Sequence, residues 1–150
     1  MKPVRAIQAF ALLLAPTALS LAALAQPRPG LPAFRVIVHP SNPVASVDRK
    51  FLADAFFKKT TRWSHDEVIR PVDQRSDSAA RNRFSEEVLR RSVDAVRNYW
   101  QQIIFSGRDV PPPELDSDEE VVKYVLKHHG ALGYVSGGAN LNGAKVVTVQ

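Results

Sequence analysis

Cysteine is absent from this sequence of 150 residues. Disulfide bridges, a thiol nucleophile and lipid attachment at a cysteine are therefore excluded, so a folded product has to be stabilised by its core alone. Two catalytic signatures are missing as well, the Gly-x-Ser-x-Gly motif and the glycine-rich loop that ends in Lys-Ser or Lys-Thr. The sequence predicts neither an enzyme nor a bound cofactor.

Metal-binding spacing is also missing. Adjacent helical residues point in different directions, so His128 and His129 are not expected to share a metal ion, and His39 and His65 are distant in sequence. The acidic cluster from Asp116 to Glu120 is typical of the first turn of a helix and lacks the spacing of a calcium loop. We expect no metal site.

Acidic residues do not occur in the first 25 positions. Lys2 and Arg5 precede an apolar run from Ala6 to Ala23, and the small residues around Ala25 are typical of a cleavage site. We expect a signal peptide, residues 1–25, cleaved near Ala25, and a periplasmic product; an uncleaved anchor is the alternative. Cleavage would remove Lys2 and Arg5 and so lower the formal charge of the chain from +5 to +3. An exported chain whose basic and acidic residues alternate is not expected to bind nucleic acid.

The rest of the chain is long enough for one compact domain. Residues 26–33 contain three prolines and a glycine and are expected to form an extended leader. Apolar runs predict strands at 34–39, 68–72, 132–135 and 146–149, with Pro71 favouring an edge position. Helical patterns follow Ser46 or Asp48 and cover about 78–91, 92–106 and 117–130. Residues 34–150 are thus predicted to form an α/β domain with a mixed, mostly parallel sheet and helices on both faces.

Two loops directly follow predicted strands. Ligands of α/β sheets bind at the carboxyl ends of strands, so the loop with Ser41 and Asn42 and the loop from Gln74 to Ser78 can lie on one edge. Arg75 offers a guanidinium fork, and Ser76 and Ser78 offer hydroxyls beside the free N–H groups of a starting helix. These groups are suited to a small oxyanion.

Asp77 has two interpretations in this loop. It accepts a hydrogen bond from a protonated oxyanion such as hydrogen phosphate, or it caps the helix and pairs with Arg81. A carboxylate that only caps the helix would repel an anion, so the two roles predict opposite behaviour. The candidate ligand-binding residues are Arg75, Ser76, Asp77, Ser78, Ser41 and Asn42.

Three segments in this order, with Trp100 between the last two, resemble the phosphate-binding protein family of ABC transporters, which has the type II periplasmic binding protein fold. They are Leu52-Ala53-Asp54-Ala55-Phe56 with Lys59-Thr60-Thr61-Arg62-Trp63, then Arg75-Ser76-Asp77-Ser78, and Gly130-Ala131-Leu132-Gly133-Tyr134-Val135. The resemblance implies one lobe of that fold, an exported solute-binding domain that captures a small oxyanion, with phosphate as the expected ligand, and contact of Arg75 and Ser78 with that ligand. An ABC transporter membrane component is then a candidate partner.

The chain departs from the family in two respects. Lys58 replaces a usual glycine, while Ala79, Ala80 and Arg81 replace the glycines and threonine of the phosphate loop. The family also closes two lobes around its ligand, and this chain is long enough for one, so a second copy or another protein would have to complete the site. The alternative is a ligand-free interaction or sensory module that docks on a membrane or envelope protein.

Overall fold

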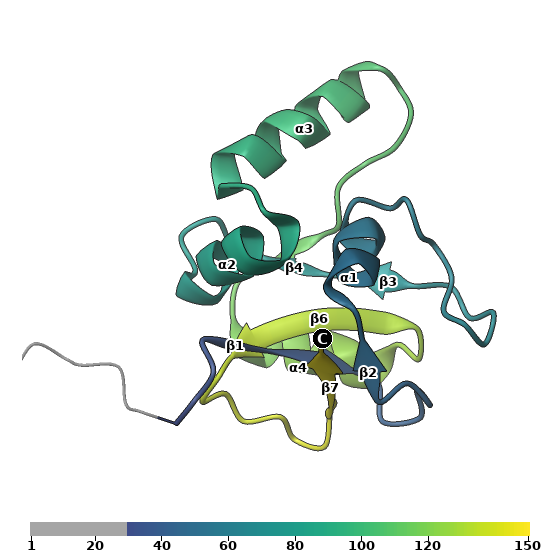
Figure 1. Cartoon of the computed structure of the whole chain (residues 1–150), viewed down its shortest axis with the longest axis vertical. Helices are drawn as coiled ribbons and strands as arrows, with labels where there is room; N and C mark the ends of the chain where they lie inside the picture. The colour runs from purple at the N-terminus through teal and green to yellow at the C-terminus, as the bar shows by residue number, and fades with distance from the viewer. Residues whose placement is uncertain (1–29) are drawn as a thin grey trace, which may run out of the picture.

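A five-stranded mixed sheet forms the centre of the chain (Figure 1). The computed structural model describes residues 30–150, so the expected signal peptide and the first half of the leader, residues 26–29, lie outside the described residues. The strands are β1 Phe34–Val38, β2 Ser46–Val47, β3 Arg70–Pro71, β4 Asp73–Gln74, β5 Glu114–Leu115, β6 Ala131–Ser136 and β7 Lys145–Val149. Their order in the sheet is β2, β7, β1, β6, β3, and β4 pairs with β5 in a separate small sheet.

The strand directions confirm the mixed sheet. The central strand β1 is antiparallel to β6 and to β7, whereas β2 runs parallel to β7, β3 to β6 and β4 to β5. Pro71 lies in the edge strand β3, as predicted, because proline has no N–H to donate to a second neighbour. This strand is shorter than the expected 68–72, although the Val72 N–H still donates to the Leu132 carbonyl at 2.9 Å.

Helices cover both faces of the sheet, as expected. They are α1 Arg49–Phe56, α2 Ala79–Phe84, α3 Val93–Phe105 and α4 Asp118–Lys127, and a π-helical turn η1 spans Ser85–Leu89. Successive residues of β1 point to opposite faces, so Val36 and Val38 join the core under α1, α2 and η1. Ile37 joins the second core, which contains Val121 and Val125 of α4.

Side chains that accept backbone hydrogen bonds define the helix starts. Asp48, and not Ser46, caps α1 by accepting from the Phe51 N–H at 2.7 Å, and Ser78, Ser92 and Ser117 cap α2, α3 and α4. The helix expected over 78–91 is divided, because α2 passes into η1 and ends where Arg90 takes a left-handed conformation with φ 56°.

The helix α3 is less buried than its apolar stripe predicts. Val96 and Trp100 are buried and Ile103 packs against the core, but Ile104 is 48% exposed, and Phe105, which follows the stripe, is 90% exposed. Figure 1 shows why: α3 projects from the body of the chain and leaves its last turn without a neighbouring element. Among residues 30–150, no helix is both long and apolar enough to cross a membrane.

Candidate functional site

The two candidate loops lie at opposite ends of the strands of the sheet. Val38, at the end of β1, lies opposite Leu132, near the start of β6. Ser41 and Asn42 therefore follow β1 on the side where β6 begins. β3 runs parallel to β6, so the chain after β3 continues toward the end of β6. There the Gln74 side chain donates to the Tyr134 carbonyl at 2.9 Å. The expectation that both loops share one edge is wrong, because β1 runs antiparallel to β3.

Asn42 and Ser41 have partners of their own at the first edge. Asn42 is buried, its side chain accepts from the Val44 N–H at 3.0 Å, and its carbonyl accepts from the Lys145 ammonium at 2.8 Å. The Ser41 hydroxyl lies 2.6 Å from Nδ1 of His39 and 3.3 Å from Nδ1 of His129. These contacts fix the loop between β1 and β2 and do not contribute to the Arg75 turn.

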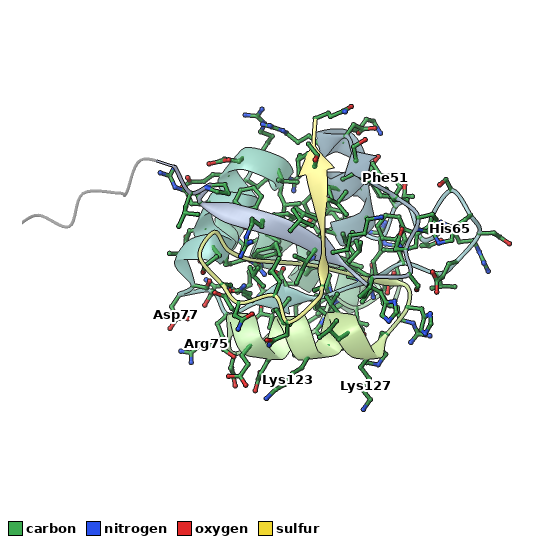
Figure 2. The ribbon with its side chains drawn as sticks, turned by 90° about the horizontal axis from the view of Figure 1, so that it is seen from below. Phe51, His65, Arg75, Asp77, Lys123 and Lys127 are labelled. Atoms are coloured by element: carbon green, nitrogen blue, oxygen red, sulfur yellow. The ribbon has the colours of Figure 1, made fainter. Side chains whose placement is uncertain are left out.

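In the turn after β4, Asp77 neutralises the Arg75 guanidinium. Arg75 donates through Nε and Nη2 to the two carboxylate oxygens of Asp77, at 3.1 and 2.7 Å, and both side chains are more than half exposed. Figure 2 shows the pair at the periphery of the molecule. Asp77 therefore pairs with Arg75, and not with Arg81 as one interpretation of the sequence predicted. The turn has no net positive charge.

The hydroxyl of Ser78 is also engaged. It donates to Oε1 of Gln74 at 2.6 Å and accepts from the Arg81 N–H at 3.3 Å, as the cap of α2. The Asn82 side chain donates to the backbone carbonyls of Ser76 and Ser78 at 3.3 and 2.9 Å. The turn is thus held closed by its own hydrogen bonds, and Ser76 is the candidate residue with the least engaged side chain.

A buried ion pair that the sequence analysis did not find lies beneath this turn. Arg81 and Asp73 are 3% and 5% exposed and form an ion pair with each other. Asp73 also accepts from the Tyr134 hydroxyl and, at 2.9 Å, from the Gln74 N–H. Burial raises the pKa of the Asp73 carboxyl against the attraction of Arg81, and burial next to Asp73 raises the pKa of the Tyr134 phenol, which stays neutral.

A cavity of about 250 Å³ separates this ion pair from α3. Its charged lining residues are Arg81, Arg97, Asp73 and Glu114, two of each sign, and Arg97 is already bound to Asp94 at 2.7 Å. The Nε atom of Arg81 has no hydrogen-bond partner but is itself out of contact with solvent. An anion in this cavity would therefore meet two carboxylates together with two arginines, Arg81 and Arg97, each of which already pairs with a carboxylate.

Comparison with solved structures identifies the fold. The chain is similar to a Clostridium perfringens protein assigned to the phosphate ABC transporter substrate-binding proteins, solved with bound phosphate (TM-score 0.62, 21% identity, 78% of this chain and 44% of that one). It is also similar to an ABC-type phosphate transport receptor from Vibrio cholerae (0.61, 19%, 78% and 46%) and to PstS from Borrelia burgdorferi (0.60, 15%, 79% and 47%).

The chain has the fold of one lobe of these receptors. It spans less than half of their length, and at these identities the similarity establishes fold alone. No protein-family model matches the sequence, and no curated protein matches it. Each segment that resembles the phosphate-binding proteins forms the type of element that the sequence predicted. Leu52 to Phe56 lie in α1, Arg75 to Ser78 lie in the turn before α2, and Ala131 to Val135 lie in β6.

Sequence reasoning missed the pairing of the charges in this lobe. One signal was present: Arg81 stands where the receptor family has a small hydroxyl residue, and a buried arginine needs a carboxylate partner. Asp73, eight positions earlier, is that partner. Because Arg75 in the turn and Arg81 in α2 are both paired, the region offers hydroxyls and ion pairs to a ligand but no free guanidinium.

Proposed function

We propose that this chain is an exported, ligand-free interaction module that has the receptor-lobe fold and docks on a membrane or envelope protein. The observation that carries the proposal is the pairing of both arginines of the phosphate-loop region, Arg75 with Asp77 and Arg81 with Asp73. An oxyanion site needs positive potential that its own carboxylates do not cancel. Here each guanidinium has a carboxylate within ion-pair distance.

The length of the lobe supports the same proposal. The similar receptors are more than twice as long as the part matched by this chain, and 78% of the chain is matched. An oxyanion held by a single wall keeps part of its hydration and interacts with screened charges, so an isolated lobe holds it weakly. Docking needs no second wall, and α3 projects from the body with an exposed apolar end.

Capture of phosphate is a second candidate function, and one observation favours it. The Arg75–Asp77 pair is exposed, with 54% and 67% of the two side chains accessible, and such a pair contributes only about 0–1 kcal/mol. A hydrogen phosphate ion that bound Arg75 and donated a hydrogen bond through its O–H to the Asp77 carboxylate would replace that pair at small cost. Sulfate has no such proton at neutral pH, so the two anions distinguish this mechanism from plain charge attraction.

Thermal unfolding in the presence of phosphate, sulfate and molybdate tests the proposal. A ligand at about a hundred times its dissociation constant adds about 2.7 kcal/mol of stability. The interaction module predicts no difference among the anions up to millimolar concentration, with sodium chloride of equal ionic strength as the control. A shift with phosphate that Arg75→Ala removes would establish capture and overturn the proposal.

A further inference from the structure

Two histidines meet at the end of the sheet where β6 begins, on the side away from the Arg75 turn. His39 directly follows β1, and His129 lies between α4 and β6. The antiparallel pairing of β1 with β6 brings these two positions together, although they are distant in the sequence. Their imidazole rings stack, with the ring centres 4.3 Å apart and the planes 16° from parallel. Because long-range strand pairing creates this contact, the sequence alone did not predict it.

Both rings direct a nitrogen at the same oxygen atom. The Ser41 hydroxyl lies 2.6 Å from Nδ1 of His39 and 3.3 Å from Nδ1 of His129. The backbone N–H of Ser41 also donates to Nδ1 of His39 at 3.1 Å, so that nitrogen presents a lone pair and has no proton. The hydroxyl therefore donates to His39 and accepts from Nδ1–H of His129. Two imidazole nitrogens thus converge on one point at the surface.

The backbone on both sides of the pair is held in place. Asn42 is 1% exposed, and its carbonyl accepts from the Lys145 ammonium at 2.8 Å, which fixes the loop after β1. The Ala131 N–H donates to the His128 carbonyl at 3.0 Å and closes the turn that contains His129. The two imidazole side chains lie at the surface, one half-buried and one exposed. They are therefore able to adjust by rotation while their backbones stay fixed.

We propose that His39 and His129 bind a divalent transition-metal ion of the zinc type, with water completing its coordination. Neutral imidazole is a preferred ligand of zinc, copper and nickel ions, whereas magnesium and calcium prefer oxygen ligands. The ion takes the position that the Ser41 hydroxyl now holds between the two Nδ1 atoms. Zinc–nitrogen bonds are about 2.0–2.1 Å long, so the nitrogens at 2.6 and 3.3 Å close in by roughly 0.5 and 1.2 Å. The exposed Ser41 side chain turns away.

The surroundings of the pair determine how tightly the ion is held. Among residues 30–150, no group of three His, Asp or Glu side chains is placed to hold a metal ion, so the chain supplies two ligands. Arg70 and Lys127 line a hollow beside His129 and form no salt bridge with another described residue. These cations repel a divalent ion, and Glu67 in the same hollow attracts it. We expect weaker binding than at a structural zinc site with four protein ligands.

Calorimetric titration of the protein with zinc chloride tests the proposal, and the protein has to be untagged because a polyhistidine tag binds zinc itself. At slightly alkaline pH, where imidazoles are neutral, we expect saturable binding of a single ion. His39→Gln and His129→Gln should each weaken it more than about tenfold, since loss of even an outer hydrogen-bond partner of a metal ligand costs about 10–100-fold. Magnesium chloride at the same concentration should not bind.

The remaining two of the four histidines provide matched controls. His128 donates through Nδ1 to the Tyr124 carbonyl at 2.9 Å, and Nε2 of His65 lies 3.1 Å from the Glu67 carboxylate. His65→Gln and His128→Gln should leave the zinc affinity unchanged. Zinc should shift the imidazole NMR signals of the proposed pair and leave the signals of the other two histidines in place. Ser41→Ala removes the hydroxyl that the ion displaces and should not lower the affinity.

Absence of saturable zinc binding would overturn the proposal. Equal losses for His65→Gln or His128→Gln and for the two ligand variants would overturn it as well, because such losses indicate binding to scattered surface histidines. Urea denaturation without metal shows whether each variant is folded, and if His39→Gln is not, the NMR titration of the parent protein decides. Phosphate takes no part in these titrations, so the metal site and the interaction module are tested separately.

Discussion

The turn before α2 and the segment after α3 both expose charged side chains to solvent but differ in the partners of those charges. In the turn, Arg75 binds Asp77 and the underlying Arg81 binds Asp73. After α3, Lys58 binds Asp109, whereas Arg108 forms no salt bridge with another described residue. A basic residue therefore indicates an anionic ligand only when no neighbouring carboxylate already pairs with it.

The largest expected effect concerns the buried pair. Asp73→Ala should destabilise the chain by about 3–5 kcal/mol, because it leaves the Arg81 guanidinium buried without its carboxylate. Asp77→Ala removes the partner of the exposed Arg75 and should cost no more than about 1 kcal/mol. Urea denaturation of both variants measures the difference. Equal losses would contradict the assignment of one pair as buried and the other as exposed.

Two aromatic residues of α3 provide the next contrast. Trp100 is 6% exposed and lines the cavity above Arg81, so Trp100→Ala should cost about 3 kcal/mol or more. Phe105→Ala, five residues further along the same helix, should change stability by less than about 0.5 kcal/mol, because its ring contacts no core. If Phe105→Ala lowered stability in urea as much as Trp100→Ala, the ring of Phe105 would be packed and not exposed as described.

The smallest expected effect comes from releasing the Arg75 guanidinium from its carboxylate partner. Asp77→Asn keeps the shape of the side chain but removes its charge, so Arg75 should become available to an anion. Phosphate at millimolar concentration should then raise the unfolding free energy of the variant by roughly 1 kcal/mol or less, since the site is open to solvent. The parent protein in the same titration is the control. If phosphate leaves the unfolding free energy of Asp77→Asn unchanged, the Arg75–Asp77 ion pair is not what prevents phosphate binding.

The sequence predicted the elements better than their contacts. Periodicity and capping residues located four helix starts, and Pro71 identified an edge strand, because these signals act over a few neighbouring residues. The relative direction of β1 and β3 is decided by long-range pairing with β6, which the local pattern of residues does not encode. For that reason Ser41 and Asn42 were placed on the wrong edge.

The candidate site shows the same limit. Arg75, Ser76, Asp77 and Ser78 form the turn that precedes α2, as expected from the cap at Ser78. Which carboxylate binds which arginine depends on side-chain directions and burial, and these follow from the packing of α2 against β4 and β6. Arg81 resembles a surface residue in the sequence, and only the fold reveals it as a buried member of an ion pair.

Equilibrium dialysis of the parent protein against radiolabelled phosphate at low ionic strength measures whether the paired arginines leave a site for phosphate. Because Asp77 and Asp73 pair with the guanidinium groups of Arg75 and Arg81, we expect the protein compartment to retain no more phosphate than the buffer compartment. Retention of one phosphate per chain, abolished by Arg75→Ala, would contradict it and would make this single lobe a phosphate-binding protein.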